Sequence, residues 1–254
     1  MTQQERAAEY QDAQRALSAQ LVEEMAPLWE LIRLGAFATT VPAWIEAVLE
    51  LLRRFAGMSG TLAADHYADE RDTAGVRGIF QPTPAEIPPG KAEASLRWAV
   101  KDLWISKADN PPPIEERLAA AEEKASGVAQ KIVADVGRDT IVQAMGEDPE
   151  VLGWGRTTGP DACFFCALMA SRGPVYESEE TAGGSANDQF EGEGKYKFHD
   201  HCDCTVYPVF RGQRWEPPAY VDEWDRLYTV STGSERGTQA KLRAFRRAFE
   251  GRED

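Results

Sequence analysis

Residues 114–145 read IEERLAAAEEKASGVAQKIVADVGRDTIVQAM and decide the fold class. Their pattern predicts one long helix, although Gly127 and Gly137 should weaken its middle because glycine is a poor helix former. Further helical stretches lie on both sides of this one. The sequence therefore predicts a mainly α protein.

The residues before this stretch predict several more helices. Apolar residues recur at three- and four-residue steps between residues 3 and 34, and Pro27 should kink or split that helix. A second helix is expected to begin near Pro42, since a first helical turn tolerates proline, and to stop near Gly57. The helical pattern restarts over residues 59–76.

Two proline-rich stretches interrupt these helices. The four prolines of residues 80–94 predict a linker or an extended strap, and a helix over residues 91–105 ends at a second proline cluster, residues 107–113. We divide the chain accordingly into a helical N-terminal region (1–110), a helix plus a Cys/His zinc-binding module (111–215), and an aromatic arm with a C-terminal amphipathic helix (216–254).

The last hundred residues predict a mixed module. Short strands are expected at 151–158 and 205–210, and residues 214–228 are interpreted as an aromatic-rich arm. Residues 234–254 predict an amphipathic helix with one apolar face, formed by Leu242, Phe245 and Phe249, and a basic collar, formed by Lys241, Arg243, Arg246 and Arg247. The expected fold is mainly α, with a helical N-terminal region, a small α+β zinc-stapled C-terminal module and a terminal amphipathic helix.

The composition limits the classes of function. The chain has 254 residues, with 42 acidic and 28 basic side chains and a formal charge of −14. Such a chain repels nucleic-acid phosphates on average, so nucleic-acid binding would need a local basic patch. The N-terminal residues are polar, with no apolar core behind a basic start, so we expect no secretory signal, and no apolar run approaches the roughly 20 residues of a membrane span. We expect a soluble protein made in a reducing cytoplasm, without a membrane partner.

All four cysteines and two of the three histidines fall within residues 163–204. A C-x-x-C pair can direct both thiols at one ion, and each of two histidines lies three residues before another cysteine. We therefore predict one structural zinc ion in a closed Cys3His shell. The candidate ligands are Cys163, Cys166, His199, Cys202, Cys204 and His201.

Other interpretations of this cluster remain open. The second half of the shell could be His199 with Cys202, or His201 with Cys204. The thiols could instead be buried apolar side chains beside incidental histidines, or form disulfides later in an extracellular particle. The remaining histidine, His66, is expected to be a packing or surface residue.

The sequence assigns no catalytic step. It lacks a G-x-S-x-G, a P-loop and an H-E-x-x-H motif, and the cysteines are needed for the metal. An alternative is a zinc-dependent HNH-type nuclease, in which a histidine beside the zinc site activates water. That family normally has a second C-x-x-C and a later asparagine or histidine, and here no histidine follows His201.

The segments WGRTTGPDACFFCALMASRGPVY (154–176) and FHDHCDCTVYPVF (198–210) resemble the MuF-like, or head-morphogenesis, minor head proteins of tailed phages, in the form found in actinobacterial phages. The residues that match the family pattern are Arg156, Cys163, Cys166, Gly173, Tyr176, His199, Cys202 and Cys204. The match favours His199 over His201 as the ligand. Residues 62–76 and the helix containing Trp98 are similar to the helical front part of such proteins.

The resemblance implies a structural virion component. Such a minor capsid protein acts near the portal during procapsid assembly, so its expected partners are the portal protein and the major capsid or scaffold proteins. The expected location is the head interior of the virion, after assembly in the host cytoplasm. The apolar face of the C-terminal helix could dock on such a partner, or its arginines could contact packaged DNA. Relatives are often called capsid maturation proteases, but the chain shows no protease dyad or triad.

Overall fold

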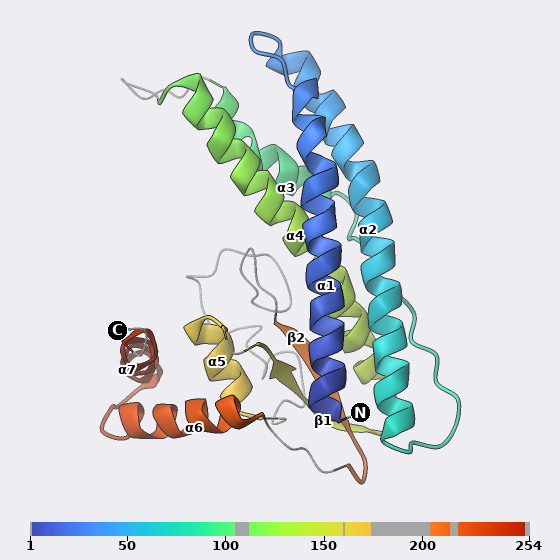
Figure 1. Cartoon of the computed structure of the whole chain (residues 1–254), viewed down its shortest axis with the longest axis vertical. Coiled ribbons are helices and arrows are strands. Elements are labelled where there is room, and N and C mark those ends of the chain that lie inside the picture. The colour runs from blue at the N-terminus through green and yellow to red at the C-terminus, as the bar shows by residue number, and fades with distance from the viewer. Residues whose placement is uncertain (1, 105–111, 160, 174–203, 214–217, 252–254) are drawn as a thin grey trace.

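The computed structural model describes residues 2–104, 112–159, 161–173, 204–213 and 218–251. Three long helices run side by side, and a two-stranded sheet lies at the end of the molecule where the chain begins (Figure 1). The shorter helices of the C-terminal part of the chain lie beside the sheet (Figure 1). The fold is therefore mainly helical with one small antiparallel sheet, as the sequence predicts.

The elements follow one another in the order α1 (Gln3–Met25), η1 (Ala26–Leu31), α2 (Phe37–Thr73), α3 (Lys91–Ala99), η2 (Lys101–Leu103), α4 (Ile114–Glu147), β1 (Val151–Thr157), α5 (Phe164–Ser171), β2 (Thr205–Phe210), α6 (Ala219–Thr232) and α7 (Thr238–Glu250). Here η denotes a 3-10 helix. None of the helices in the described residues is both long enough and apolar enough to cross a membrane.

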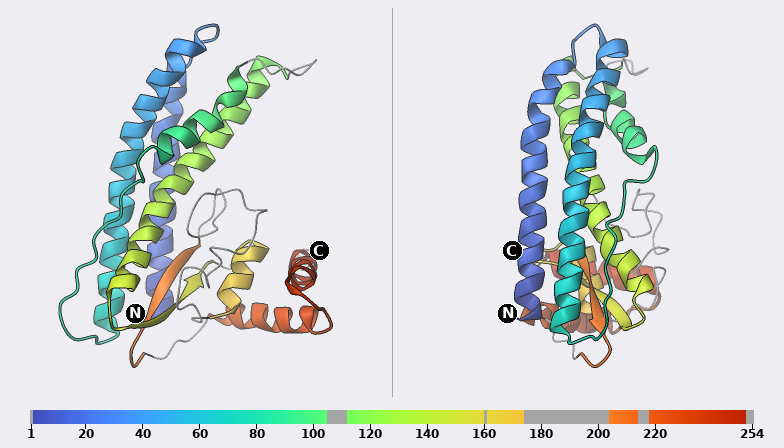
Figure 2. Two further views of the ribbon diagram at one scale, coloured as in Figure 1. Left: turned by 180° about the vertical axis from the view of Figure 1, so that it is seen from behind. Right: turned by 90° about the vertical axis from the view of Figure 1, so that its right-hand side faces the viewer.

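Several predicted elements are confirmed. The long helix expected at 114–145 is α4, and both expected strands are present as β1 and β2. Pro27 lies where α1 gives way to a 3-10 helix, so the predicted split of the first helix is also confirmed. The proline-rich segment 80–94 begins as an extended strap that returns along α2 towards α3 (Figure 2).

The predicted break in the second helix is wrong. α2 begins five residues before Pro42 and continues through Gly57 without interruption. The missing N–H of Pro42 removes only one hydrogen bond near the start of a 37-residue helix. Beyond Gly57, the buried side chains of α2 continue along α4, so tertiary packing outweighs the low helix propensity of a single glycine.

The aromatic arm and the terminal helix form a helical hairpin. Residues 219–228 of the expected arm are helical, as part of α6, and α7 packs against both α6 and α5. Phe245 is completely buried there, with its ring 5.8 Å from that of Tyr228. The apolar face of α7 is thus partly covered within this chain, with Phe245 buried and Leu242 and Phe249 half-buried, and docking of this face on a partner stays a prediction.

The upper core joins the three long helices to α3. It includes Leu21, Trp44, Leu52, Leu96 and Ile132, all of them buried. The boundary drawn at residues 110 and 111 thus separates α3 from α4, although these two helices share the same core. The division into three segments stays a prediction about independent folding.

Glycines allow the helices and the strap to approach closely. A Cβ atom on Gly137 of α4 would lie 2.7 Å from the Ser59 hydroxyl and 2.9 Å from the Gln14 amide nitrogen. The Ser59 hydroxyl donates to the side-chain oxygen of Gln14, and the Gln14 amide nitrogen donates to the backbone oxygen of Ser59, so these bonds join α1 to α2. A Cβ on Gly60 would similarly lie 3.0 Å from Pro84 in the strap. Gly137 therefore weakens the helix locally but permits the contact of three helices.

The sheet lies against the lower end of α4. β1 pairs with β2 in antiparallel register, with Arg156 opposite Val206 and Gly155 opposite Tyr207. A Cβ on Gly155 would overlap the Tyr207 ring, at 2.4 Å from its hydroxyl oxygen, so only glycine leaves room for this tyrosine. The lower core beneath the sheet contains Tyr67, Ile141, Trp154, Phe165 and Phe210.

Substituting Gly137 tests this close approach. We expect Gly137→Ala to lower the free energy of unfolding by about 1–3 kcal/mol, because the added methyl would displace the Gln14–Ser59 hydrogen bonds. Gly57→Ala is the control: its Cβ meets nothing within 4 Å, so it should stabilise the protein by up to about 1 kcal/mol. Urea unfolding of the three proteins gives both values. Stabilisation by both substitutions would contradict the packing described.

Candidate functional site

The first cysteine pair forms the beginning of α5. Cys163 is the N-cap residue of this helix, and its sulfur accepts a hydrogen bond from the backbone N–H of Cys166 at 3.4 Å. Cys163 is half-buried and Cys166 is buried. The N-terminus of a helix in general favours negative charge. Thiolates are the form in which cysteine binds metal.

Cys204 reaches the same region from the neighbouring strand of the sheet. It directly precedes β2, whose first residue, Thr205, pairs with Thr157 at the end of β1. α5 begins seven residues after that end of β1, so strand pairing brings the two cysteine-bearing segments together. Cys166 and Cys204 are both buried in the lower core, and Cys163 packs against it.

Arg138 of α4 holds the backbone of Cys204. Its Nε donates a hydrogen bond to the Cys204 carbonyl oxygen at 2.8 Å, and its Nη1 contacts Asp135 at 3.1 Å. The Arg138 side chain is only 4% exposed. The sulfur of Cys204 lies 3.2 Å from the Thr158 hydroxyl, and Tyr220 of α6 donates to the Thr158 carbonyl oxygen at 2.6 Å. Cys204 is thus held by residues from α4, α6 and the end of β1.

Half of the predicted metal ligands can be placed. Cys163, Cys166 and Cys204 converge on the lower core, whereas His199, His201 and Cys202 lie outside the described residues. Among the residues that the structure describes, no group of three or more His, Cys, Asp and Glu side chains is arranged to hold a metal ion. The zinc ion and the choice between the two histidines stay predictions.

Arg156, the motif arginine, is buried beside the first cysteine pair. It lies in β1, is 2% exposed, and its guanidinium is 5.7 Å from the centre of the Phe165 ring. Phe165 follows Cys163 by two residues at the start of α5. The arginine thus packs the sheet against α5, in contact with the segment that carries the first two cysteines.

Two buried ion pairs near the sheet were not predicted from the sequence. Arg6 of α1 forms a bidentate contact with Glu70 of α2, at 2.6 and 3.0 Å. Arg71 of α2 contacts Asp148, just after α4, at 2.8 Å, and Tyr67 donates to the same carboxylate at 3.2 Å. A helical projection could have found them, because Tyr67, Glu70 and Arg71 lie at three- and four-residue steps on one face of α2.

His66 is a packing residue, as expected. Its ring stacks on Tyr10 of α1, with centroids 4.4 Å apart and planes 3° from parallel. Burial, with a smaller contribution from Arg6, lowers the pKa of His66 to about 4. Its imidazole is therefore neutral near pH 7. This neutral ring fills the contact between α1 and α2 beside the Arg6–Glu70 pair.

The lowered pKa of His66 predicts a loss of stability in mild acid. The unfolded chain binds a proton near pH 6.5 and the folded chain only near pH 4, so stability falls as the pH drops between these values. His66→Phe keeps the stacked ring but removes this titration. Between these pH values, the wild type should lose up to about 3 kcal/mol more than the variant. Chemical unfolding across this range measures the difference, and equal pH slopes would contradict the assignment.

Comparison with known proteins shows where the chain belongs. The family described as "VG15 protein" matches residues 1–231. The gene 15 protein of Mycobacterium phage L5 is 28% identical over 248 residues, which cover 82% of this chain and 79% of the relative. The gene 15 protein of Mycobacterium phage D29 is 27% identical over 172 residues, which cover 57% of this chain and 60% of the relative. No solved structure matches. The chain therefore belongs to the VG15 family of phage proteins and is a distant homologue of these two gene 15 proteins.

Proposed function

We propose that this phage protein is a minor structural component of the head, of the MuF-like or head-morphogenesis type, which acts at the portal and procapsid during assembly. The observation that carries the proposal is the arrangement of the motif residues. Arg156, Cys163, Cys166 and Cys204 come from β1, α5 and the start of β2, and they meet at one small core beside the helical bundle. Membership of a phage protein family supports the same conclusion.

A structural role also agrees with the use of the buried charges. Arg6, Glu70, Arg71, Asp148 and Arg138 each join two elements of the fold through hydrogen bonds. Such contacts fix the relative positions of helices and strands, but they occupy the groups that a reaction would need. We therefore assign the protein no catalytic step. The HNH-type nuclease stays the alternative, since it would use the histidines at 199 and 201.

We further propose that one zinc ion closes the cysteine module. The donor chemistry fits this metal, because Cys163 and Cys166 begin one helix and Cys204 lies in the same core. Either His199 with Cys202 or His201 with Cys204 would complete the four-ligand shell that Cys163 and Cys166 begin. The metal would supply stability to a module whose sheet has two strands and which is too small to be stable by its own core.

The proposed partners are the portal protein and the major capsid or scaffold proteins, within the virion head. Because Phe245 and Phe249 of the apolar face pack with residues of α5 and α6, we propose that contact through this helix uses mainly its other face. Arg243, Arg246 and Arg247 are exposed on that face. Packaged DNA is the partner that this basic face would suit, in a chain that is otherwise acidic.

Metal content tests the zinc site. We expect one zinc per chain in the wild type, and loss of zinc together with a lower melting temperature in Cys163→Ser and Cys166→Ser, whose cysteines belong to both alternative shells. His66→Phe is the control, because His66 is not a candidate ligand and phenylalanine keeps a ring stacked on Tyr10, so the zinc content should stay unchanged. Elemental analysis of freshly reduced protein measures this. Zinc-free wild type would remove the structural metal site, and the nuclease alternative with it.

Incorporation into heads tests the structural role. We expect the protein in purified procapsids and mature heads at a few copies per particle, and defective heads when its gene carries an early stop codon. Complementation with Cys163→Ser should fail, whereas complementation with His66→Phe should succeed. Mass spectrometry and electron microscopy of the particles give the answer. Absence of the protein from procapsids and heads would contradict the proposal.

A further inference from the structure

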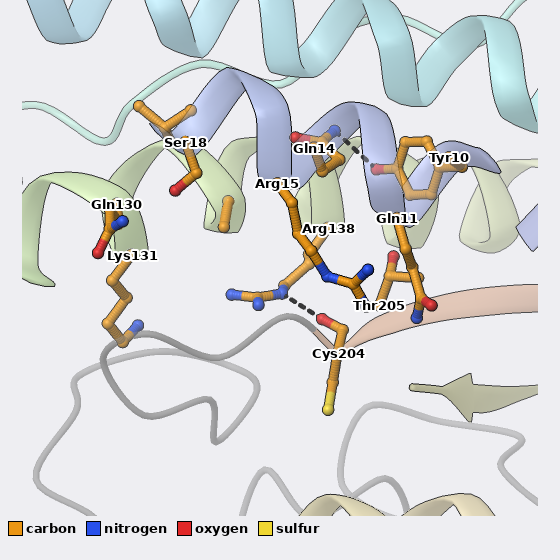
Figure 3. A pocket seen from close by; sticks show the side chains of 12 residues that line it. Tyr10, Gln11, Gln14, Arg15, Ser18, Gln130, Lys131, Arg138, Cys204 and Thr205 are labelled. Carbon is orange, nitrogen blue, oxygen red and sulfur yellow. Dashed lines mark hydrogen bonds between the residues drawn. The ribbon is translucent and has the colours of Figure 1, made fainter. Parts of the chain in front are cut away.

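A groove lies between α2 and the strap, where the strap leads into α3. Its volume is about 600 Å³. Among the described residues, it shares no lining residue with the small pocket beside Cys204 (Figure 3). The groove is lined by Leu49 and Gly57 of α2, by Ile87 and Pro88 of the strap and by the first turn of α3. Leu49 and Ile87 are only half-buried and Pro88 is exposed, so the groove presents apolar surface to solvent.

Both walls of the groove are fixed in place. The backbone N–H of Ala85, in the strap, donates to the Thr140 hydroxyl of α4 at 2.9 Å. Lys91, at the start of α3, pairs with Asp135 of α4 at 3.2 Å. A Cβ atom on Gly57 would meet nothing within 4 Å, so α2 borders the groove at this point without filling it. The groove is therefore preformed, and a binding partner would not have to order it.

An isoleucine projects from the beginning of the same strap. Ile79 is fully exposed, whereas the next residue, Phe80, packs on Tyr67 of α2 with ring centroids 5.7 Å apart. On the other side, Arg71 of α2 donates to the Gly78 carbonyl oxygen at 2.7 Å. The turn that carries Ile79 is thus held to α2 on both sides. Its apolar side chain is presented from a fixed backbone, which lowers the entropy cost of burying it against another molecule.

This turn and the groove carry opposite charges. Arg77 precedes Ile79 by two residues, and we call residues 77–79 the knob. Glu86 lines the groove, and both Arg77 and Glu86 are exposed. Within the described part of the chain, neither of them forms an ion pair. The other charged side chains that line the groove, Arg53 and Glu93, are each paired within their own helix. The cation of the knob therefore matches the available carboxylate of the groove.

We propose that a second copy of this chain occupies the groove, with the knob of each copy in the groove of the other. Ile79 then packs against Leu49 and Ile87, and Arg77 pairs with Glu86. In a two-fold dimer each contact forms twice, because each copy supplies one knob and one groove. Both lie along one strap, so the two contacts belong to one continuous interface. The inference is independent of the proposed role in the head, because it rests on the knob and the groove alone.

Analytical ultracentrifugation of the full chain tests the proposal. We expect a monomer–dimer equilibrium at micromolar concentrations. Ile79→Asp should weaken dimerisation by roughly a hundredfold or more, because each dimer loses two apolar contacts. Val230→Asp is the matched control, since Val230 is also strongly exposed but lies on α6, outside the strap and the groove. This control should leave dimerisation unchanged.

Further variants test the groove and the ion pair separately. Gly57→Leu adds a side chain to open space on a helix, so the variant should fold but fill the groove and weaken dimerisation. Arg77→Glu and Glu86→Arg should each weaken dimerisation by roughly tenfold. The double variant should restore it, because the same pair forms with its charges exchanged.

A wild type that stays monomeric throughout the micromolar range would overturn the inference. Equal weakening of dimerisation by Ile79→Asp and Val230→Asp would also overturn it, since the effect would then not depend on the knob. A dimer that Gly57→Leu leaves intact would exclude the groove as the interface. A double charge variant that dimerises no better than the single variants would reject the pairing of Arg77 with Glu86 on which the choice of a second copy rests.

Discussion

The structure depends on the hydrogen bond from the buried guanidinium of Arg138 to the carbonyl oxygen of Cys204. A sheet of two strands is marginally stable on its own, so β1 and β2 need support from a larger element. That support is α4, which the upper core holds rigidly against α1 and α2. Arg138 lies where α4 passes the start of β2. Its hydrogen bond therefore attaches the cysteine-bearing strand to the stable helical bundle.

The other buried charges connect the same parts of the molecule. The Arg6–Glu70 pair fixes α1 on α2, and the Arg71–Asp148 pair fixes α2 on the turn between α4 and β1. Burying such charges costs desolvation energy, and each pair adds more specificity of position than stability. α5 extends this connection, since Phe165 and Met169 pack in the lower core while Ala167 and Ala170 pack against α6 and α7. The first cysteine pair, at the beginning of α5, is therefore in a position to fix the C-terminal hairpin as well.

Local patterns in the sequence predict some of this fold and leave other parts out. α4, β1 and β2 follow from periodicity and flanking glycines, and the change of helix type at Pro27 follows from backbone chemistry. The continuity of α2 through Gly57 does not follow, because it results from packing against α4. The local pattern also does not predict why residue 137 is a glycine. The groups that lie close to Gly137 belong to Ser59 and Gln14, which are 78 and 123 positions away in the sequence. The cysteine spacing indicates a common site, but Arg138, which positions Cys204, carries no signal in a helix with many charged residues.

The central claim is that the bundle stabilises the cysteine-bearing strand through Arg138. Hydrogen–deuterium exchange of the wild type and Arg138→Gln, analysed by mass spectrometry, tests it most directly. The account predicts that backbone amides of Thr205–Phe210 and their partners in Val151–Thr157 exchange faster in the variant, while the buried middle of α2 around Val48 and Leu52 keeps its protection. Unchanged protection of β2 in the variant, or an equal loss of protection in α2, would contradict the claim.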